Sequence, residues 1–237
     1  MNILITGGAS GLGEAITRRL AAGATGKVFF TYNRSEEKAM AIEAEFEDTT
    51  GIRCDFTDPI ALRSLLDLIP QLDLSILVNN AWTGTFIDTY FHKTPVADFA
   101  AGFSQNILPT IAITQAVINA FRKKKSGKII TILTAALSET PPIGSSVYVA
   151  NKAYLEELTK VWAIENIKYN ITSNAVSPSF MLTGLTASID ERLIEQMTQN
   201  HPLLTTVEVA EKVAFLIEAG PELNGANIVI NPTTNIK

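Results

Sequence analysis

The sequence is poor in the residue types that most often build metal sites and covalent crosslinks. Cys54 is the single cysteine among 237 residues, so the chain can form neither an internal disulfide nor a cysteine cluster for a metal. His92 and His201 are isolated, and neither has ligand-like spacing to another metal-binding side chain. We therefore predict no metal site, and we interpret Cys54 as a small buried thiol that suits a reducing cytoplasm.

Long apolar runs, basic excess and flexible linkers are also missing. No apolar stretch reaches the roughly 20 residues that span a bilayer, and Met1 leads into an apolar segment with nothing that resembles a cleaved signal. The net charge of -5 argues against a nucleic-acid-binding surface, and the run Arg122–Lys125 fits a solvated helix C-terminus. With 46% hydrophobic residues and no composition break, we expect one unprocessed, soluble domain over residues 1–237.

Strand-like apolar runs alternate with helix-like segments along the whole chain. The expected strands are 2–6, 27–32, 51–54, 74–79, 128–134, 170–176 and 226–230. The expected helices are 14–22, 36–47, 59–68, 96–124, 145–166 and 207–219. This alternation predicts a single α/β domain of the Rossmann type, a doubly wound parallel sheet of about seven strands with helices on both faces. Ligands of such sheets bind beyond the carboxyl ends of the strands.

A glycine-rich turn follows the first expected strand. The segment from Thr6 to Gly13 reads TGGASGLG and leads into a helix-like segment. Gly7 permits a tight turn, Gly11 lets backbone N–H groups approach a pyrophosphate, and Gly13 lets the helix pack on the strand. An ordinary glycine-rich loop is the alternative, but the flanking strand and helix are what a dinucleotide-binding fingerprint requires.

Tyr148 and Lys152 lie four residues apart in the expected helix 145–166, so an ammonium can lie close to a phenol. A nearby positive charge favours the phenolate and lowers the tyrosine pKa. Such a tyrosine can give its proton to a carbonyl oxygen as hydride reaches the carbon. Taken alone the pair is more often structural, and the glycine-rich turn is what favours hydride transfer.

Several motifs in order resemble the short-chain dehydrogenase/reductase family, from Asn2 to about Ile230. The matching positions are Thr6 to Gly13 for TGxxxGxG, Asp55 for the acid after the third strand, Asn79-Asn80-Ala81 for most of NNAG, Asn106, Tyr148 with Lys152, and Pro178 with Thr183. The resemblance implies an NAD(P)-dependent oxidoreductase acting on CH–OH or C=O groups. The overall pattern is most similar to bacterial 3-oxoacyl-acyl-carrier-protein reductases.

The resemblance also implies a set of cofactor-binding residues. They are Gly7, Ser10, Gly11, Leu12, Gly13, Asn33, Arg34, Ser35, Asp55, Phe56, Asn80, Ala81, Tyr148, Lys152, Pro178, Met181 and Thr183. Asp55 would bond the adenine amino group, Asn80 would contact the ribose region, and Thr183 with backbone near Met181 would hold the carboxamide. Two of these have simple alternatives, because Asp55 could cap the helix near Thr57 and Pro178 could be only a turn residue.

The implied catalytic set is Tyr148, Lys152, Asn106 and a hydroxyl at the end of the fifth strand. Lys152 would bind the nicotinamide ribose, and Asn106 would support a water chain that reprotonates Tyr148. Asn106 could instead satisfy a helix kink before Pro109.

The family usually has a serine at the end of the fifth strand, and our candidate here is Thr134, whose hydroxyl can donate to a developing alkoxide. Thr131 and Ser138 are alternatives. Thr134 could also be a strand-end residue of high β propensity.

Three segments depart from the family pattern. Trp82 stands where NNAG has glycine, Ser179 where a glycine often follows the proline, and Asn231-Pro-Thr-Thr234 where the end is usually glycine-rich. Trp82 could form a flat apolar wall over the substrate pocket or pack in the core. If it blocked the nicotinamide, the chain could be a non-catalytic dinucleotide-binding regulator. The intact Tyr148, Lys152 and Asn106 argue against that alternative.

The end of the second expected strand indicates the cofactor. It reads Tyr-Asn-Arg-Ser, so Arg34 can pair with a 2′-phosphate while Asn33 and Ser35 add donors, and no acid intervenes before Glu36. We therefore favour NADP(H) over NAD(H) and the reductive direction. A solvated turn arginine is the alternative.

The substrate and the assembly are less well specified. The predicted substrate pocket comprises Trp82, Thr134 and Leu185, under an apolar lid over 182–204. A carrier-linked 3-oxoacyl group is favoured over a sugar-derived or other small ketone, with an acyl carrier protein as partner. Lys125 and Lys168 could face that acidic carrier or could simply be solvated. Family members commonly form homodimers or homotetramers through the helices expected at 96–124 and 145–166, and sometimes through the last strand.

Overall fold

The computed structural model describes residues 1–23, 25–86, 89–186, 194 and 203–232. In this part of the chain, seven strands form one sheet in the order β3-β2-β1-β4-β5-β6-β7, and every pairing is parallel. The strands are β1 (Asn2–Ile5), β2 (Val28–Tyr32), β3 (Thr49–Arg53), β4 (Leu74–Asn79), β5 (Gly127–Ile132), β6 (Ile171–Pro178) and β7 (Asn227–Ile230). The predicted doubly wound Rossmann-type sheet is confirmed.

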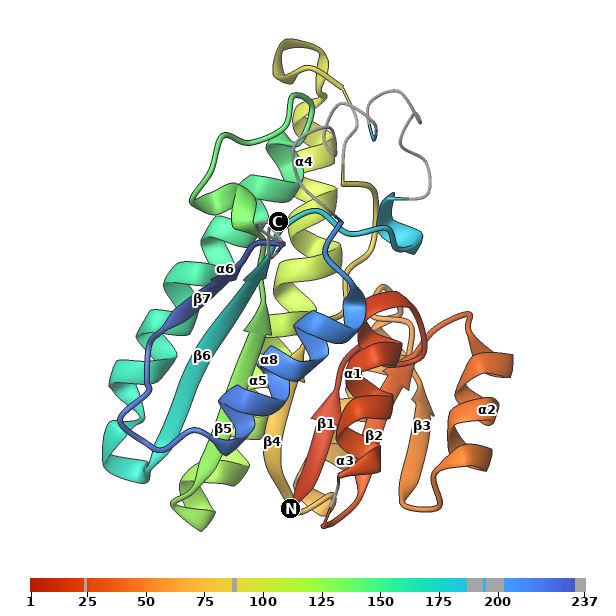
Figure 1. The fold of residues 1–237 in the computed structure, drawn as a ribbon, viewed down its shortest axis with the longest axis vertical. Coiled ribbons are helices and arrows are strands. Elements are labelled where there is room, and N and C mark those ends of the chain that lie inside the picture. Colours follow the sequence, from red (N-terminus) through yellow and green to blue (C-terminus); the bar gives the residue numbers. More distant parts are fainter. Residues whose placement is uncertain (24, 87–88, 187–193, 195–202, 233–237) are drawn as a thin grey trace, which may run out of the picture.

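Helices cover both faces of the sheet (Figure 1). One layer holds α1 (Gly11–Ala22), α2 (Glu36–Glu45) and α8 (Thr206–Glu218), and the other holds α3 (Pro59–Leu68), α5 (Leu108–Lys124) and α6 (Ser146–Glu165). Helix α4 (Val96–Gly102) stands above the carboxyl ends of the strands. Short 3-10 turns are Ile69–Gln71, Phe91–Lys93, Ala135–Leu137, Ile167–Tyr169 and Gly184–Thr186.

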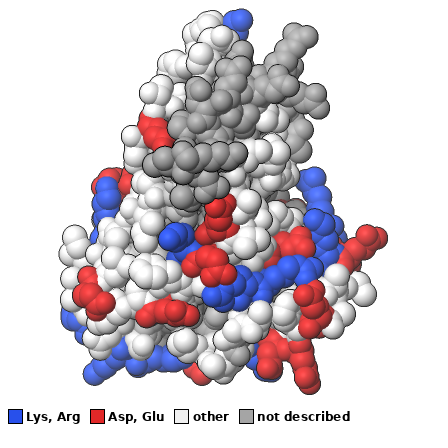
Figure 2. Space-filling view, viewed as in Figure 1, with Lys and Arg blue, Asp and Glu red and all other residues white. Residues whose placement is uncertain are grey.

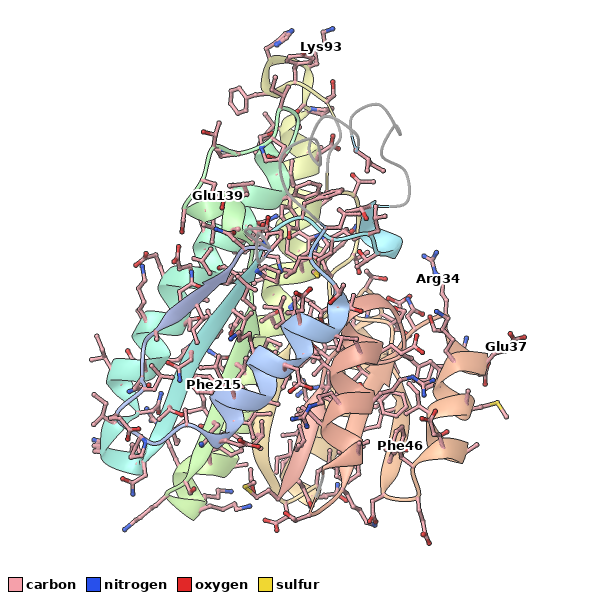
Figure 3. The ribbon with its side chains drawn as sticks, viewed as in Figure 1. Arg34, Glu37, Phe46, Lys93, Glu139 and Phe215 are labelled. Atoms are coloured by element: carbon pink, nitrogen blue, oxygen red, sulfur yellow. The ribbon has the colours of Figure 1, made fainter. Side chains whose placement is uncertain are left out.

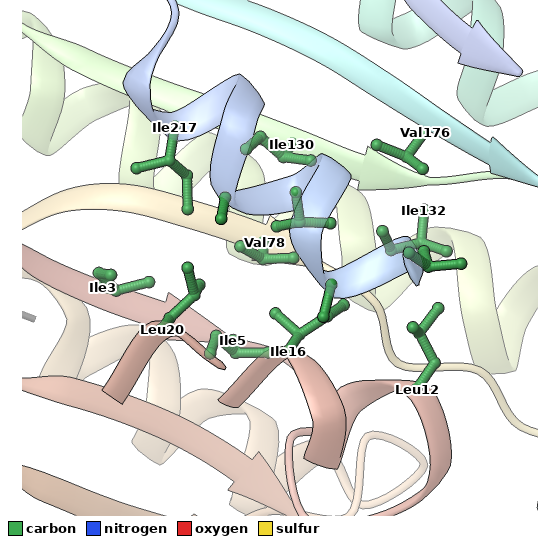
Figure 4. Packing of buried hydrophobic residues seen from close by; sticks show 14 of the residues in the cluster. Ile3, Ile5, Leu12, Ile16, Leu20, Val78, Ile130, Ile132, Val176 and Ile217 are labelled. Atoms are coloured by element: carbon green, nitrogen blue, oxygen red, sulfur yellow. The ribbon is translucent and has the colours of Figure 1, made fainter. Parts of the chain in front are cut away.

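The two layers arise from the alternation of side chains along each strand. In β1, Ile3 and Ile5 face the core under α1 and α8, whereas Leu4 faces the core under α3 and α5. Figure 4 shows Ile16 of α1 and Ile217 of α8 directed at the same face of the sheet. Because both faces are covered, the strands read as continuous apolar runs, and their carboxyl ends are left open for a ligand.

Element boundaries differ from the predictions where local patterns are weak. Strand β3 begins at Thr49 because Thr49 and Thr50 pair with Val28 and Phe29, two positions before the predicted start. The helix predicted over 96–124 is interrupted by a π turn at Phe103–Ile107, between α4 and α5. Strand β5 ends at Ile132, so Thr134 lies beyond the strand rather than in it.

Charged side chains of both signs are interspersed over the lower half of the face seen in Figure 2. Several form ion pairs between elements, such as Arg18 of α1 with Glu45 of α2 and Arg19 of α1 with Glu211 of α8. In the described ranges, no helix is both long and apolar enough to cross a membrane.

Candidate active site

A cavity of about 820 Å³ opens at the carboxyl ends of the strands. Every residue that the sequence predicted to bind cofactor or substrate lines this cavity, and Asn106 alone of the predicted site residues does not. The lining also contains Tyr32, Thr83, Phe86, Glu139 and Phe180, which the sequence reasoning did not single out. The cavity is continuous from the glycine-rich turn to Tyr148, so a single extended ligand can contact both motifs.

The glycine-rich turn fits a pyrophosphate. Gly7 has a φ of +67°, and a Cβ on it would lie 2.9 Å from the Ala81 Cα. A Cβ on Gly13 would lie 2.0 Å from the Gly7 carbonyl oxygen, so only glycine lets α1 approach the turn. The Ser10 side chain does not cap α1, and the first N–H groups of the helix therefore remain available to an anion.

Asn80 fixes this turn from the end of β4. Its Nδ2 donates to the carbonyl oxygens of Thr6 at 3.0 Å and Gly7 at 3.2 Å. In return, the Thr6 hydroxyl accepts from the backbone N–H groups of Asn80 at 2.9 Å and Ala81 at 3.0 Å. The amide of Asn80 thus holds the cradle in shape while the residue also lines the cavity.

The far end of the cavity is polar. Arg34 projects from the turn between β2 and α2 (Figure 3), and Asn33, Ser35 and Asp55 lie beside it in the lining. Hydrogen bonds from Thr57 hold the pKa of Asp55 below its usual value, with smaller effects from Asn33 and the Arg34 charge. The alternative role for Asp55 was wrong, because the residue that caps α3 is Asp58, which accepts from Ile60 N at 2.8 Å.

Tyr148 and Lys152 lie one turn apart on the buried side of α6. The Lys152 Nζ donates to the Ile132 carbonyl at 2.7 Å, and burial lowers the pKa of Lys152 to about 7. Burial raises the pKa of Tyr148 to about 12, and a hydrogen bond with the Thr134 side chain opposes this rise. The lowered tyrosine pKa expected from the sequence is therefore not found here, because loss of hydration outweighs the effect of the Thr134 side chain.

Thr134 is the candidate hydroxyl that lies beside Tyr148. It precedes the 3-10 turn Ala135–Leu137, and its Oγ1 accepts from Ala136 N at 3.3 Å. The alternatives lie elsewhere, because Thr131 is fully buried in the sheet, Ser138 is exposed, and neither lines the cavity. Because β5 ends at Ile132, the chain leaves the sheet before Thr134, and this places Thr134 rather than Thr131 or Ser138 beside Tyr148.

The Trp82 indole points into the cavity and contacts both members of the helical pair. Its ring centroid is 4.9 Å from that of Tyr148 in an edge-to-face arrangement, and 4.6 Å from the Lys152 Nζ. Phe86 packs on Tyr148 in the same way, also at 4.9 Å. Trp82 therefore lies in the pocket rather than in the core. No sequence pattern marks Phe86, which follows Trp82 in an irregular loop.

Asn106 lies in the π turn, buried behind the loop that carries Trp82. Its Oδ1 accepts from Thr83 N at 2.7 Å, and its Nδ2 donates to the carbonyls of Thr83 and Gly102, both at 3.0 Å. The side chain thus ties the helical element to this loop. π turns are frequent at functional sites.

The remaining predicted positions fall into two groups. Met181, Thr183 and Leu185 line the cavity, but most of the expected lid, including Ile189, Leu193 and Met197, lies outside the described residues, as do His201 and Thr234. Lys125 and Lys168 precede the amino ends of β5 and β6, at the opposite end of the sheet from the cavity.

The chain matches a family of known proteins. Residues 1–193 match the family model described as short chain dehydrogenase. The chain is 29% identical to the 3-oxoacyl-acyl-carrier-protein reductase FabG of Aquifex aeolicus, covering 96% of this chain and 94% of that protein. It is 32% identical to the 3-oxoacyl-acyl-carrier-protein reductase of Synechocystis, with 90% and 87% covered.

A solved structure agrees with the family model and with these two relatives. The short chain dehydrogenase from Burkholderia cenocepacia, in complex with NADP, superposes with a TM-score of 0.83 at 28% identity over 97% of this chain and 95% of its own. The chain therefore belongs to the short-chain dehydrogenase/reductase family of NAD(P)-dependent oxidoreductases.

Proposed function

We propose that the chain, as a single domain over residues 1–237, is an NADPH-dependent reductase that converts a ketone to a hydroxyl group. One observation carries the proposal. The Tyr148 phenol, beside Thr134 and one turn from Lys152, lines the same cavity as the glycine-rich cradle. The similarity to the Aquifex and Synechocystis 3-oxoacyl-acyl-carrier-protein reductases supports a 3-oxoacyl group carried by acyl carrier protein as the substrate.

The residues of the cradle and its surroundings would hold the dinucleotide. Backbone N–H groups at the start of α1 would bind the pyrophosphate, Asp55 the adenine, and Thr183 the nicotinamide carboxamide. When bound, NADPH supplies the hydride. Arg34, with Asn33 and Ser35, would bind the 2′-phosphate, because a guanidinium forms bidentate hydrogen bonds with phosphate oxygens. The bound NADP of the Burkholderia relative supports this preference.

Tyr148 would act as the proton donor. A pKa of about 12 keeps its proton in place at neutral pH, and a developing alkoxide is a strong enough base to take it. Thr134 would donate a hydrogen bond to the same oxygen, where negative charge develops. Lys152 would stabilise the phenolate that remains after transfer. A protonated Tyr148 favours reduction, because the reverse reaction needs the phenolate at the start.

The substrate end of the cavity is aromatic. Trp82 and Phe86 pack edge-to-face on Tyr148, Phe180 packs on Phe86, and Leu185 also lines the cavity. Such walls suit the apolar part of an acyl chain. A sugar-derived or other small ketone is the alternative substrate. Lys125 and Lys168 give no support to carrier docking at the cavity mouth of their own chain, because they lie at the opposite end of the sheet.

The first experiment is a titration of the purified protein with NADPH and NADH, followed by nicotinamide fluorescence. A short 3-oxoacyl thioester is then added to the better-bound cofactor. We expect tighter binding of NADPH and its oxidation on addition of the thioester. Binding without oxidation would leave the family chemistry but reject this substrate, and a panel of small ketones would follow. Failure to bind either cofactor would reject the reductase and favour a non-catalytic protein in which Trp82 blocks the nicotinamide site.

We also propose a cytoplasmic, homo-oligomeric protein. The single thiol, Cys54, is buried, and burial raises its pKa to about 11, which suits an unreactive cysteine in a reducing compartment. Exposed apolar side chains on α6, namely Tyr154, Val161 and Ile164, support pairing of long helices between copies of the chain.

A further inference from the structure

Among the residues that the structure describes, no carboxylate pairs with the buried Lys152 ammonium. Lys152 is 4% exposed, and its Nζ donates one hydrogen bond, to the Ile132 carbonyl. In the described part of the cavity lining, the other charged side chains are Arg34, Asp55 and Glu139, and none of them forms an ion pair with Lys152. A buried ammonium has three donors and normally requires a charged or strongly polar partner. The stabilising partner must therefore be a different kind of group.

Trp82 provides such a group. Its indole face lies 4.6 Å from the Lys152 Nζ, whereas the Tyr148 ring centroid is farther away, at 5.7 Å. Indole is the aromatic group that attracts cations most strongly, and the attraction grows when both partners are desolvated. The indole Nε1 is buried and has no hydrogen-bond partner among the described residues. A buried tryptophan usually satisfies this N–H, so the ring is oriented by its face rather than by its nitrogen.

The orientation of the indole is held by its neighbours. Asn106 binds the backbone of the next residue, Thr83, through both its N–H and its carbonyl. Tyr148 packs edge-to-face on the Trp82 ring, on the helix that also carries Lys152. The indole is therefore held in contact with both Tyr148 and Lys152.

We propose that Trp82 is a positioning residue, whose indole face keeps the buried Lys152 ammonium charged and directed toward Tyr148 in place of a carboxylate. The inference rests on the proposed function for its catalytic meaning, but the contact itself does not. The proposal gives a role to Trp82, which stands at the glycine position of NNAG and is the chain's clearest departure from the family motif.

The direction of the effect follows from the groups that face Lys152. Among the described residues, these are the Tyr148 ring on α6, the Ile132 carbonyl on β5 and the Trp82 ring after β4. Burial lowers the lysine pKa to about 7, close to neutrality, and the indole face acts in the opposite direction because it favours the cation. Loss of the indole without entry of water should therefore leave the lysine mostly neutral at pH 7.

The test compares Trp82→Leu, which fills the space without a π face, with Trp82→Phe, which keeps a weaker one. The pKa of Lys152 is measured by ¹³C NMR on protein labelled at the lysine Cε, with Lys152→Met identifying the resonance. We expect the midpoint to fall by about one pH unit or more in Trp82→Leu and by less in Trp82→Phe. Phe86→Leu is the matched control, because Phe86 packs on Tyr148 and forms no cation–π contact with Lys152.

An unchanged midpoint in both tryptophan variants would overturn the proposal. If Trp82→Leu does not fold, a Lys152 midpoint in Trp82→Phe that equals the wild-type value would also overturn the proposal. Because the NMR titration needs no cofactor or substrate, it is separate from the reductase assay. A shifted midpoint in a protein that reduces no ketone would reject the proposed function and retain the positioning of Lys152. In an active enzyme, the basic limb of kcat/KM should move to lower pH in Trp82→Leu.

Discussion

Asn106 holds the backbone of Thr83 from both sides, since its Oδ1 accepts from Thr83 N at 2.7 Å and its Nδ2 donates to the Thr83 carbonyl at 3.0 Å. The π turn makes this possible by placing Asn106 on the side of the helical element that faces the loop after β4. The residue predicted as part of a proton relay is thus also a support for the loop that carries Trp82. The water relay itself stays a prediction.

Replacement of Asn106 tests this support. Asn106→Ala removes three hydrogen bonds to backbone groups, and we expect a loss of about 1–3 kcal/mol in the free energy of unfolding. We also expect lower kcat/KM, because Trp82 is no longer held against Lys152. Urea denaturation and the ketone reduction assay give the two values. Ser104→Ala, an exposed position in the same π turn, is the control, and equal stability of the two variants would reject the supporting role.

The buried Lys152 makes stability depend on pH in a definite direction. Its pKa falls from the ordinary 10.5 to about 7 on folding. Between these values the unfolded chain binds one more proton than the folded chain, so stability rises with pH in this window. Relative to Lys152→Met, the wild type should gain up to roughly 1.4 kcal/mol per pH unit from about pH 7 to 10.5, with no further change below pH 7.

Urea denaturation of both proteins across this range measures the difference, which isolates Lys152 from other titrating groups. A difference that stays constant with pH would mean that Lys152 keeps its ordinary pKa in the folded protein.

Much of the fold and of the cavity could be predicted because it depends on local pattern. Apolar runs such as Ile3-Leu4-Ile5 bury both of their faces, and this marks parallel strands. A four-residue spacing puts Tyr148 and Lys152 on one side of a helix whatever surrounds them. Glycines at Gly7 and Gly13 are required by close backbone contacts that the TGxxxGxG motif encodes directly.

The features that were missed depend on packing between distant segments. The pKa of Tyr148 is set by burial under Trp82 and Phe86, which no motif around Tyr148 records. The π turn brings Asn106 to Thr83, 23 positions earlier in the chain, and no local pattern around Asn106 records that contact. The sequence could not decide whether the Trp82 side chain points into the pocket or into the core, because an indole is apolar enough for either.

The Tyr148 and Thr134 hydroxyls should have separate roles in the proposed reaction. Tyr148→Phe removes the proton donor, and we expect at least a 100-fold loss of kcat with NADPH binding retained. Thr134→Ser should keep most of the activity, whereas Thr134→Ala should lose roughly 10²–10³-fold, as expected for one donor to a developing oxyanion. Steady-state kinetics and a fluorescence titration measure the two effects. Full turnover by Tyr148→Phe would remove this residue from the mechanism, and a harmless Thr134→Ala would leave the oxygen without an assigned second donor.

Arg34 should determine the preference for NADPH. A charge-assisted pair with a 2′-phosphate contributes roughly 1.5–3 kcal/mol, so Arg34→Ala should weaken NADPH binding by about 10- to 100-fold. NADH lacks this phosphate, and its binding should change little. Arg53→Ala is a suitable control, because Arg53 is an exposed arginine at the end of the neighbouring β3 and does not line the cavity. Equal losses for both cofactors would place Arg34 against another part of the dinucleotide.

The apolar face of α6 should mediate self-association. Val161 and Ile164 are 44% and 73% exposed and lie three residues apart on one side of the helix, with Tyr154 a further two turns away along the same face. Each apolar side chain buried between copies contributes roughly 1.5–3 kcal/mol, so the double variant Val161→Lys/Ile164→Lys should weaken association at least 100-fold. Size-exclusion chromatography with light scattering should then detect monomers. Ile60→Lys on α3, at a side chain that is 77% exposed, should leave the assembly intact. If the double variant assembles as the wild type does, pairing through α6 is excluded, and the edge strand β7 becomes the surface to change next.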